Sequence, residues 1–96
     1  MSWKRYGEPV DMEAYRFRYF PHVFRWRGRR FQVDCVERTW LAPRRPWQRA
    51  PQRRVFRTCG PDGRFEIHHD LDAGTWHLER AELPPTPTLT TRLSFG

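Results

Sequence analysis

Arginine is the residue type that decides which chemistry this sequence can support. Lysine and arginine together number 18 against 11 acidic residues, and all but Lys4 are arginines. Thirteen of the arginines gather in residues 16–59 with only two acids, whereas residues 1–15 and 60–96 each carry a net negative charge. A GC-rich genome explains arginine in place of lysine, but it does not explain this clustering. Because the planar guanidinium group suits phosphate, the clustering indicates an anion-binding surface.

Two segments carry the arginines best placed for such a surface. Residues 22–35 alternate apolar residues with arginine, and residues 42–52 hold three prolines and three arginines around Trp47. An aromatic ring among arginines could stack a nucleobase while the guanidiniums hold phosphates. The alternative is a solvated linker whose tryptophan packs back onto the domain. The candidate nucleic-acid-binding residues are Arg25, Arg27, Arg29, Arg30, Arg44, Arg45, Trp47, Arg53 and Arg54.

These residues predict a small, basic, non-catalytic domain that binds single-stranded or structured nucleic acid. A basic face could also hold an acidic protein, so an adaptor for a protein partner is the alternative. The sequence contains no P-loop, GxGxxG, HExxH or GxSxG motif. We therefore expect no enzymatic activity and no cofactor.

One histidine pair raises a metal alternative. His68 and His77 are predicted cross-strand neighbours on an outer face, with Asp70 and Asp72 close by, and two histidines with a carboxylate could hold a divalent ion. The simpler interpretation, which we adopt, is that these are ordinary residues of an exposed face and a turn. His69, opposite Trp76, is predicted to be a core histidine.

The element that positions the first arginine group is a predicted β-hairpin over residues 22–35. Apolar and polar residues alternate on both sides of Gly28, and a two-residue loop at Gly28-Arg29 would suit a type II′ turn. One face would then be apolar and the other basic. The predicted cross-strand pairs are Trp26–Phe31, Phe24–Val33 and His22–Cys35 on the apolar face, and Arg27–Arg30 and Arg25–Gln32 on the basic face.

The remaining chain predicts further strands around this hairpin. Residues 8–12 suit an edge strand and residues 14–20 a second strand, with a helix over 11–18 as the alternative. The apolar phase slips after Cys35, which indicates a bulge or a curl. Strands are predicted at 53–59, 64–69 and 75–83, joined by turns at 60–63 and 71–74.

The predicted fold is therefore all-β: a strongly twisted antiparallel meander of five or six strands, forming a small SH3-like or OB-like barrel. The domain is expected to span residues 1–83, followed by a flexible Pro/Thr-rich tail over 84–96. The sequence shows neither an apolar run of membrane-spanning length nor a signal-peptide segment, so we expect a cytoplasmic protein without membrane contact. In the cytoplasm Cys35 and Cys59 should be thiols, and Cys35 is predicted to be buried.

Several segments resemble an uncharacterised family of small bacterial domains. They are the segment Phe24-Arg25-Trp26-Arg27-Gly28-Arg29-Arg30-Phe31, the Pro/Trp/Arg loop, and the segment Gly74-Thr75-Trp76-His77-Leu78-Glu79-Arg80-Ala81. The family's pattern, FRWRGRRY…GxWxLERV, covers about residues 8–82. Some of its members accompany the translesion Y-family polymerase system. The resemblance implies a role beside DNA repair or lesion bypass.

The tail resembles the peptide by which bacterial proteins bind the sliding clamp, Gln-x-x-Leu-x-Phe. Leu93 and Phe95 match its apolar anchors, whereas Thr90 stands at the position of the glutamine. The resemblance implies a possible protein partner for the tail.

Overall fold

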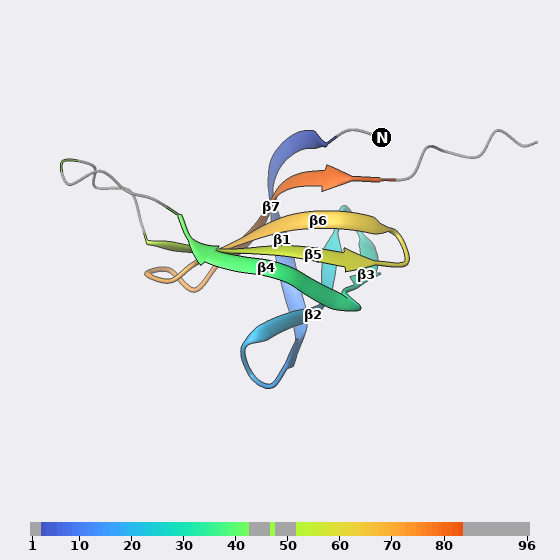
Figure 1. Ribbon diagram of the computed structural model, residues 1–96, viewed down its shortest axis with the longest axis horizontal. Coiled ribbons are helices and arrows are strands. Elements are labelled where there is room, and N and C mark those ends of the chain that lie inside the picture. The colour runs from blue at the N-terminus through green and yellow to red at the C-terminus, as the bar shows by residue number, and fades with distance from the viewer. Residues whose placement is uncertain (1–2, 43–46, 48–51, 84–96) are drawn as a thin grey trace, which may run out of the picture.

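The chain forms seven β-strands. The computed structural model describes residues 3–42, 47 and 52–83, and no helix occurs in that part of the chain. The strands are β1 (Lys4–Arg16), β2 (Phe20–Trp26), β3 (Arg29–Gln32), β4 (Cys35–Leu41), β5 (Arg53–Gly60), β6 (Gly63–Asp70) and β7 (Trp76–Glu82) (Figure 1). Arg44, Arg45 and the tail with Leu93 and Phe95 lie outside the described residues.

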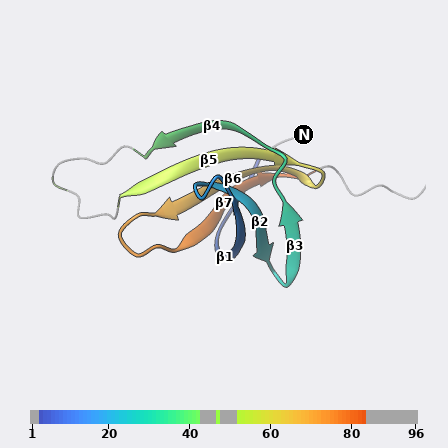
Figure 2. The same ribbon diagram turned by 90° about the horizontal axis from the view of Figure 1, so that it is seen from below.

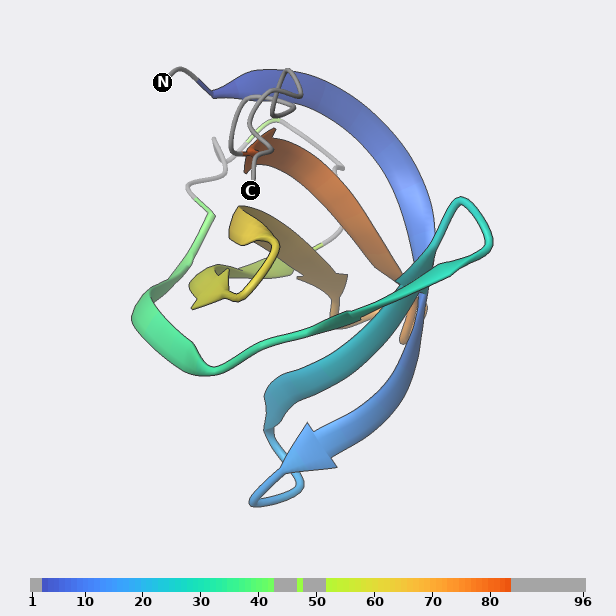
Figure 3. The ribbon, with the colours of Figure 1, turned by 90° about the vertical axis from the view of Figure 1, so that its right-hand side faces the viewer.

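All neighbouring strands run antiparallel in one sheet of order β3-β2-β1-β7-β6-β5-β4. The sheet curls strongly into a half-barrel, with β5, β6 and β7 side by side and the β2–β3 hairpin folded across them (Figures 2 and 3). The predicted all-β antiparallel fold is confirmed. The strand count is seven rather than five or six, because the second arm of the central hairpin splits into β3 at one sheet edge and β4 at the other.

The central hairpin forms, but its predicted register is wrong by two residues. Phe24 pairs with Phe31 and Trp26 with Arg29, so the two-residue loop is Arg27-Gly28. Both loop residues have positive φ, 54° and 74°, as a type I′ turn requires. A type I′ turn accepts glycine at its second position, and it follows the twist of the flanking strands. A shift by two residues leaves every side chain on its predicted face.

The core lies on the concave face of the sheet and is mainly aromatic. Phe24, Phe56, Phe65, Ile67 and Leu78 have no exposed surface, and they pack with other buried apolar side chains into one cluster. Several rings meet edge to face, the geometry that aromatic pairs prefer. For example, Phe24 and Phe65 lie 5.2 Å apart between ring centroids. The alternating apolar residues of the sequence therefore build this core.

The N-terminal segment differs from its predicted form. Residues 4–16 make one long strand in the middle of the sheet, between β2 and β7, rather than an edge strand or a helix. Pro9 pairs with β7 alone, because the pairing of β1 with β2 begins at Asp11, and a proline is tolerated where one side of the strand is unpaired. Just before it, the pairing with β7 shifts between Arg5 and Glu8, where Gly7 adopts a φ of 60°. Phe17–Tyr19 form the turn to β2.

The C-terminal half agrees with its predicted form. Gly60 pairs with Gly63 around the first turn, and Asp70 and Thr75 close the second loop through a 2.8 Å backbone hydrogen bond. Ile67 pairs with Leu78, and His69 pairs with Trp76. The phase slip after Cys35 corresponds to a bulge in the pairing of β4 with β5, between Val36 and Arg38.

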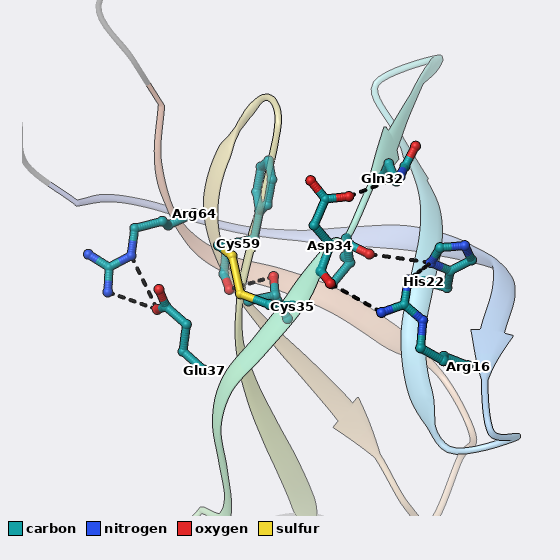
Figure 4. Close-up of a disulfide and its surroundings, with 11 residues drawn as sticks. Arg16, His22, Gln32, Asp34, Cys35, Glu37, Cys59 and Arg64 are labelled. Atoms are coloured by element: carbon teal, nitrogen blue, oxygen red, sulfur yellow. Dashed lines mark hydrogen bonds and ion pairs between the residues drawn. A yellow bond between two sulfur atoms is a disulfide. The ribbon is translucent and has the colours of Figure 1, made fainter.

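The prediction of a buried Cys35 thiol is wrong. Cys35 is exposed and forms a disulfide with Cys59, with the two Cα atoms 5.3 Å apart (Figure 4). The reason lies in the topology. After β3 the chain crosses to the opposite sheet edge, where Cys35 is the first residue of β4 and lies opposite Cys59 of β5. It therefore does not face His22, which is hydrogen-bonded to Val33 instead.

Candidate functional site

The arginines of the β2–β3 hairpin are held by carboxylates. Arg25 and Arg30 both bind Glu13, at 2.9 and 2.7 Å. Arg27 contacts Glu8 through two hydrogen bonds. Arg29 binds Asp62 of the β5–β6 turn at 2.7 Å. All four predicted phosphate ligands of this hairpin therefore already have anionic partners.

These ion pairs shift the pKa values of their carboxyl groups. Hydrogen bonds from Arg27 and Trp26 lower the pKa of Glu8 from 4.5 to about 2. The hydrogen bond from Arg25, with help from Arg30, lowers the pKa of Glu13 although partial desolvation opposes it. Both carboxylates are thus ionised at neutral pH and offset much of the positive charge of the hairpin.

The β1–β2 turn, at the other end of β2 from the hairpin turn, carries exposed aromatic side chains instead of ion pairs. In and beside the β1–β2 turn, Phe17, Tyr15 and Tyr19 are 83%, 49% and 42% exposed. Phe17 and Arg18 have positive φ, 56° and 61°, which turns both side chains away from a regular strand path. Arg18 forms no ion pair with a carboxylate in the described part of the chain. Exposed rings and an uncompensated cation therefore share one turn.

This turn and the end of β1 pack against the starts of β5 and β7. The guanidinium of Arg54 lies over the Tyr19 ring, 5.5 Å from its centroid, and Tyr15 lies 5.9 Å from Trp76. His69 stacks on Trp76 at 4.0 Å with an angle of 4° between the rings. Burial lowers the pKa of His69, so this ring is neutral at pH 7. We call this group the aromatic end; its members are Tyr15, Phe17, Arg18, Tyr19, Arg54, His69 and Trp76.

Part of the second predicted arginine group adjoins the aromatic end. The loop after β4 is closed at its base by a 2.9 Å hydrogen bond from Ala42 N–H to the Arg53 carbonyl. Arg53 and Arg54 follow this base, and neither forms an ion pair with a carboxylate among the described residues. Trp47, within the loop, is 73% exposed. The structure thus brings Arg54 to the aromatic end and separates it from the hairpin arginines. Arg53, the preceding residue of β5, lies on the opposite face of the sheet, where its charge acts on His77.

The aromatic residues of the β1–β2 turn were not among the predicted site residues. Their signal is visible in the sequence as alternating tyrosine, phenylalanine and arginine over residues 15–19. The alternation favours a strand with one buried face. The exposure follows only from the turn at Phe17–Tyr19, which places the rings beyond the core.

A cavity of about 420 Å³ lies where the half-barrel is open, between β2 and β4. Phe20, Pro21 and Val36 form much of its apolar wall, and Arg16 and Arg38 lie at its border. Arg16 is engaged there, because it donates hydrogen bonds to the Asp34 carbonyl and to His22 (Figure 4). The cavity also includes Glu37 in its lining, so it is a mixed apolar and charged opening next to the disulfide.

The predicted neighbours His68 and His77 do face each other across β6 and β7, with ring centroids 5.0 Å apart. The two aspartates have other roles. Asp70 accepts backbone hydrogen bonds within its own loop, and Asp72 accepts one from the Gln52 N–H. Burial, followed by the charges of His68 and Arg53, lowers the pKa of His77. The carboxylate that accompanies the pair is Glu79.

Comparisons of the chain with family models, with curated proteins and with solved structures find no match in any of the three. No helix in the described part of the chain is long and apolar enough to cross a membrane. The geometry of the molecule is therefore the basis for a functional proposal.

Proposed function

We propose that the protein binds single-stranded nucleic acid, without catalysis, at the aromatic end. The observation that carries this proposal is the packing of exposed rings next to arginines that have no carboxylate partner among the described residues. Tyr15, Phe17 and Tyr19 offer ring faces for bases, and Arg18 and Arg54 offer charge for phosphates. Stacking on such rings contributes about 1–3 kcal/mol per base, and every base has a face to stack.

The predicted residues divide into two groups under this proposal. Arg54 keeps its predicted role, whereas Arg53 lies on the opposite face of β5, near His77. Arg44 and Arg45 lie outside the described residues, and a role for them and for Trp47 in nucleic-acid binding stays a prediction. The hairpin residues Arg25, Arg27, Arg29 and Arg30 contribute little, because each would have to leave a carboxylate before it could bind a phosphate. A role beside DNA repair, which the family resemblance implies, is compatible with single-strand binding and stays a prediction.

The test is fluorescence anisotropy with labelled single-stranded DNA and RNA of about 12 nucleotides and with a duplex control. We expect single strands to bind more tightly than the duplex, and affinity to fall steeply between about 50 and 200 mM salt. Phe17→Ala and Arg54→Ala should each weaken binding by about tenfold, which corresponds to the loss of one stacked base or one desolvated phosphate contact.

The matched control is Arg30→Ala, which removes an arginine of the hairpin without touching the aromatic end. We expect its affinity to stay within about twofold of the wild type, since Arg30 already binds Glu13 at 2.7 Å. Absence of binding at low salt would overturn the proposal. Equal losses from Arg30→Ala and Arg54→Ala would also overturn it, and would favour a general basic face or an acidic protein partner.

A further inference from the structure

The face of β6 and β7 opposite the core carries a cluster of side chains of the types that bind metal ions. These side chains are not part of the proposed nucleic-acid interface. One donor atom each from His68, His77 and Glu79 lies within 4.8 Å of the other two. The three come from the centre of the sheet, where strand pairing holds the backbone. They are also largely shielded from water, with His68 buried and the other two partly buried.

The sheet geometry explains why these three side chains converge. His68 and His77 are directly paired in register, so their side chains lie on the same face. Glu79 follows His77 by two residues, which also places it on that face. Next to it the pairing shifts between Glu66 and Ile67, so that β7 carries an extra residue and Glu66 pairs with Arg80. This bulge directs Glu79 toward the histidines.

His68 supplies an independent indication of a missing ligand. The residue is only 8% exposed, and its Nε2 atom lies 3.2 Å from Glu66 Oε2. Its Nδ1 atom is buried and has no hydrogen-bond partner among the described residues. A buried polar atom without a partner costs about 1–3 kcal/mol of stability. A histidine that binds a metal through one nitrogen commonly donates its other ring N–H to a carboxylate, as His68 can to Glu66.

We propose that His68, His77 and Glu79 form a binding site for a divalent transition metal ion of the zinc type, with Glu66 orienting His68. Two imidazoles and one carboxylate are a donor set that zinc accepts, and three protein ligands leave a fourth position for water. The ion would give the Nδ1 atom of His68 the partner that it lacks.

The neighbouring cations are Arg53, whose charge acts on His77, and three arginines that are paired with carboxylates. Arg57 and Arg80 lie 3.3 and 3.9 Å from Glu66, and they compensate the charge of that carboxylate. Arg5 lies 3.4 Å from Glu79, but its side chain is 71% exposed. It can therefore swing into solvent when Glu79 binds a metal. Glu79 is thus free to supply the negative charge that favours a divalent cation.

The test uses untagged, oxidised protein, first treated with a chelator and then titrated with Co²⁺ and Zn²⁺. We expect one equivalent of Co²⁺ to give the visible absorption of a four-coordinate site, and Zn²⁺ to displace it. His77→Ala and Glu79→Gln should each weaken binding at least tenfold. Glu66→Gln should weaken it by about 10–100-fold, as expected for a carboxylate that orients a ligand.

Two controls separate this site from others. His22→Ala removes a histidine outside the cluster and should leave metal binding unchanged. Cys35, Glu37 and Cys59 form a second group of possible ligands, but their sulfurs are joined in the disulfide. The double variant Cys35→Ser/Cys59→Ser should therefore bind Zn²⁺ as the wild type does. Absence of binding, or binding that survives His77→Ala, would overturn the proposal, and neither result depends on nucleic acid.

Discussion

Arg27 shows how a single side chain can hold a strained backbone position. It adopts a positive φ, which is uncommon for a residue with a side chain, at the tip of the β2–β3 hairpin. Its guanidinium lies over the rings of Trp26 and Tyr6, at 4.8 and 5.3 Å, and binds Glu8. Glu8 also accepts a 2.8 Å hydrogen bond from the Trp26 indole. The residue therefore acts as a clamp between the hairpin and β1.

The acidity of Glu8 makes this clamp testable by pH. Its pKa is about 2 in the folded chain and near 4.5 when unperturbed. A lowered carboxyl pKa contributes stability that is present above the unfolded value and is lost as the pH falls through the folded value. The melting temperature of the wild type should therefore exceed that of Glu8→Gln at neutral pH. This difference should shrink between pH 4.5 and about 2.

The control for this series is Asp11→Asn, which changes an exposed carboxylate of the same strand that has no ion pair among the described residues. The melting temperature of Asp11→Asn should be closer to that of the wild type than the melting temperature of Glu8→Gln is, at every pH above about 4.5. If Glu8→Gln melts at the same temperature as the wild type at neutral pH, then the clamp contributes no stability.

At the scale of elements, the sequence predicts on which face of a strand a side chain lies better than it predicts which residue that side chain contacts. Period-two alternation identifies which side chains of residues 22–33 point inward, and the structure keeps all of them inward despite the changed turn. The turn itself depends on whether Arg27 accepts a positive φ before Gly28, as the observed type I′ turn requires, or Gly28 alone does, as the predicted type II′ turn requires. In the observed turn Arg27 is hydrogen-bonded to Glu8, which belongs to a strand distant in the sequence.

Contacts between strands distant in the sequence also decide which arginines of the candidate site are available to bind a ligand. The sequence identifies the arginines, but Glu8, Glu13 and Asp62 reach the hairpin only because β1 lies beside β2 and the β5–β6 turn lies near β3. Net charge counted along segments therefore overstates the positive charge of the hairpin. Pairings between strands that are distant in sequence carry this information, and local patterns do not contain it.

The disulfide joins two neighbouring strands, β4 and β5, which are also paired along their length. Cys35 begins β4 and Cys59 lies near the end of β5, and a closed loop with a sequence separation of 24 includes the whole segment 42–52. Such a cross-link restricts the unfolded chain and contributes about 2–4 kcal/mol. Reduction should therefore lower the free energy of unfolding by about 2–4 kcal/mol, which is measured as a lower urea midpoint.

The measurement is urea denaturation with and without a phosphine reductant. Cys35→Ser/Cys59→Ser should match the reduced wild type and should not respond to the reductant. Identical midpoints for oxidised and reduced wild type would show that the cross-link adds no stability. Because disulfides persist in oxidising compartments, the cysteines no longer support the predicted cytoplasmic location, which stays a prediction.

At the scale of the whole molecule, the chain makes a close approach to β5 where it passes from one edge of the half-barrel to the other. The link between β3 and β4 passes over the end of β5, where the Asp34 N–H donates a 2.8 Å hydrogen bond to the Cys59 carbonyl. Gly60 lies directly beneath. A Cβ atom on Gly60 would lie 2.1 Å from the backbone oxygen of Gln32. Only glycine allows this approach, and the curled sheet depends on it.

Gly60→Ala should therefore open the half-barrel at this crossing. The clash involves backbone rather than a flexible side chain, so the link must move, and overpacking of this kind costs about 1–3 kcal/mol. Hydrogen exchange should accelerate at the amides of Val33 and Asp34, whose hydrogen bonds fix the link. Gly74→Ala is the matched control, since no atom lies within 4 Å of its added Cβ and only its φ of 74° opposes alanine. That variant should lose some stability but leave the amides of Val33 and Asp34 protected. Unchanged exchange in Gly60→Ala would mean that the close approach at Gly60 does not hold the link in place.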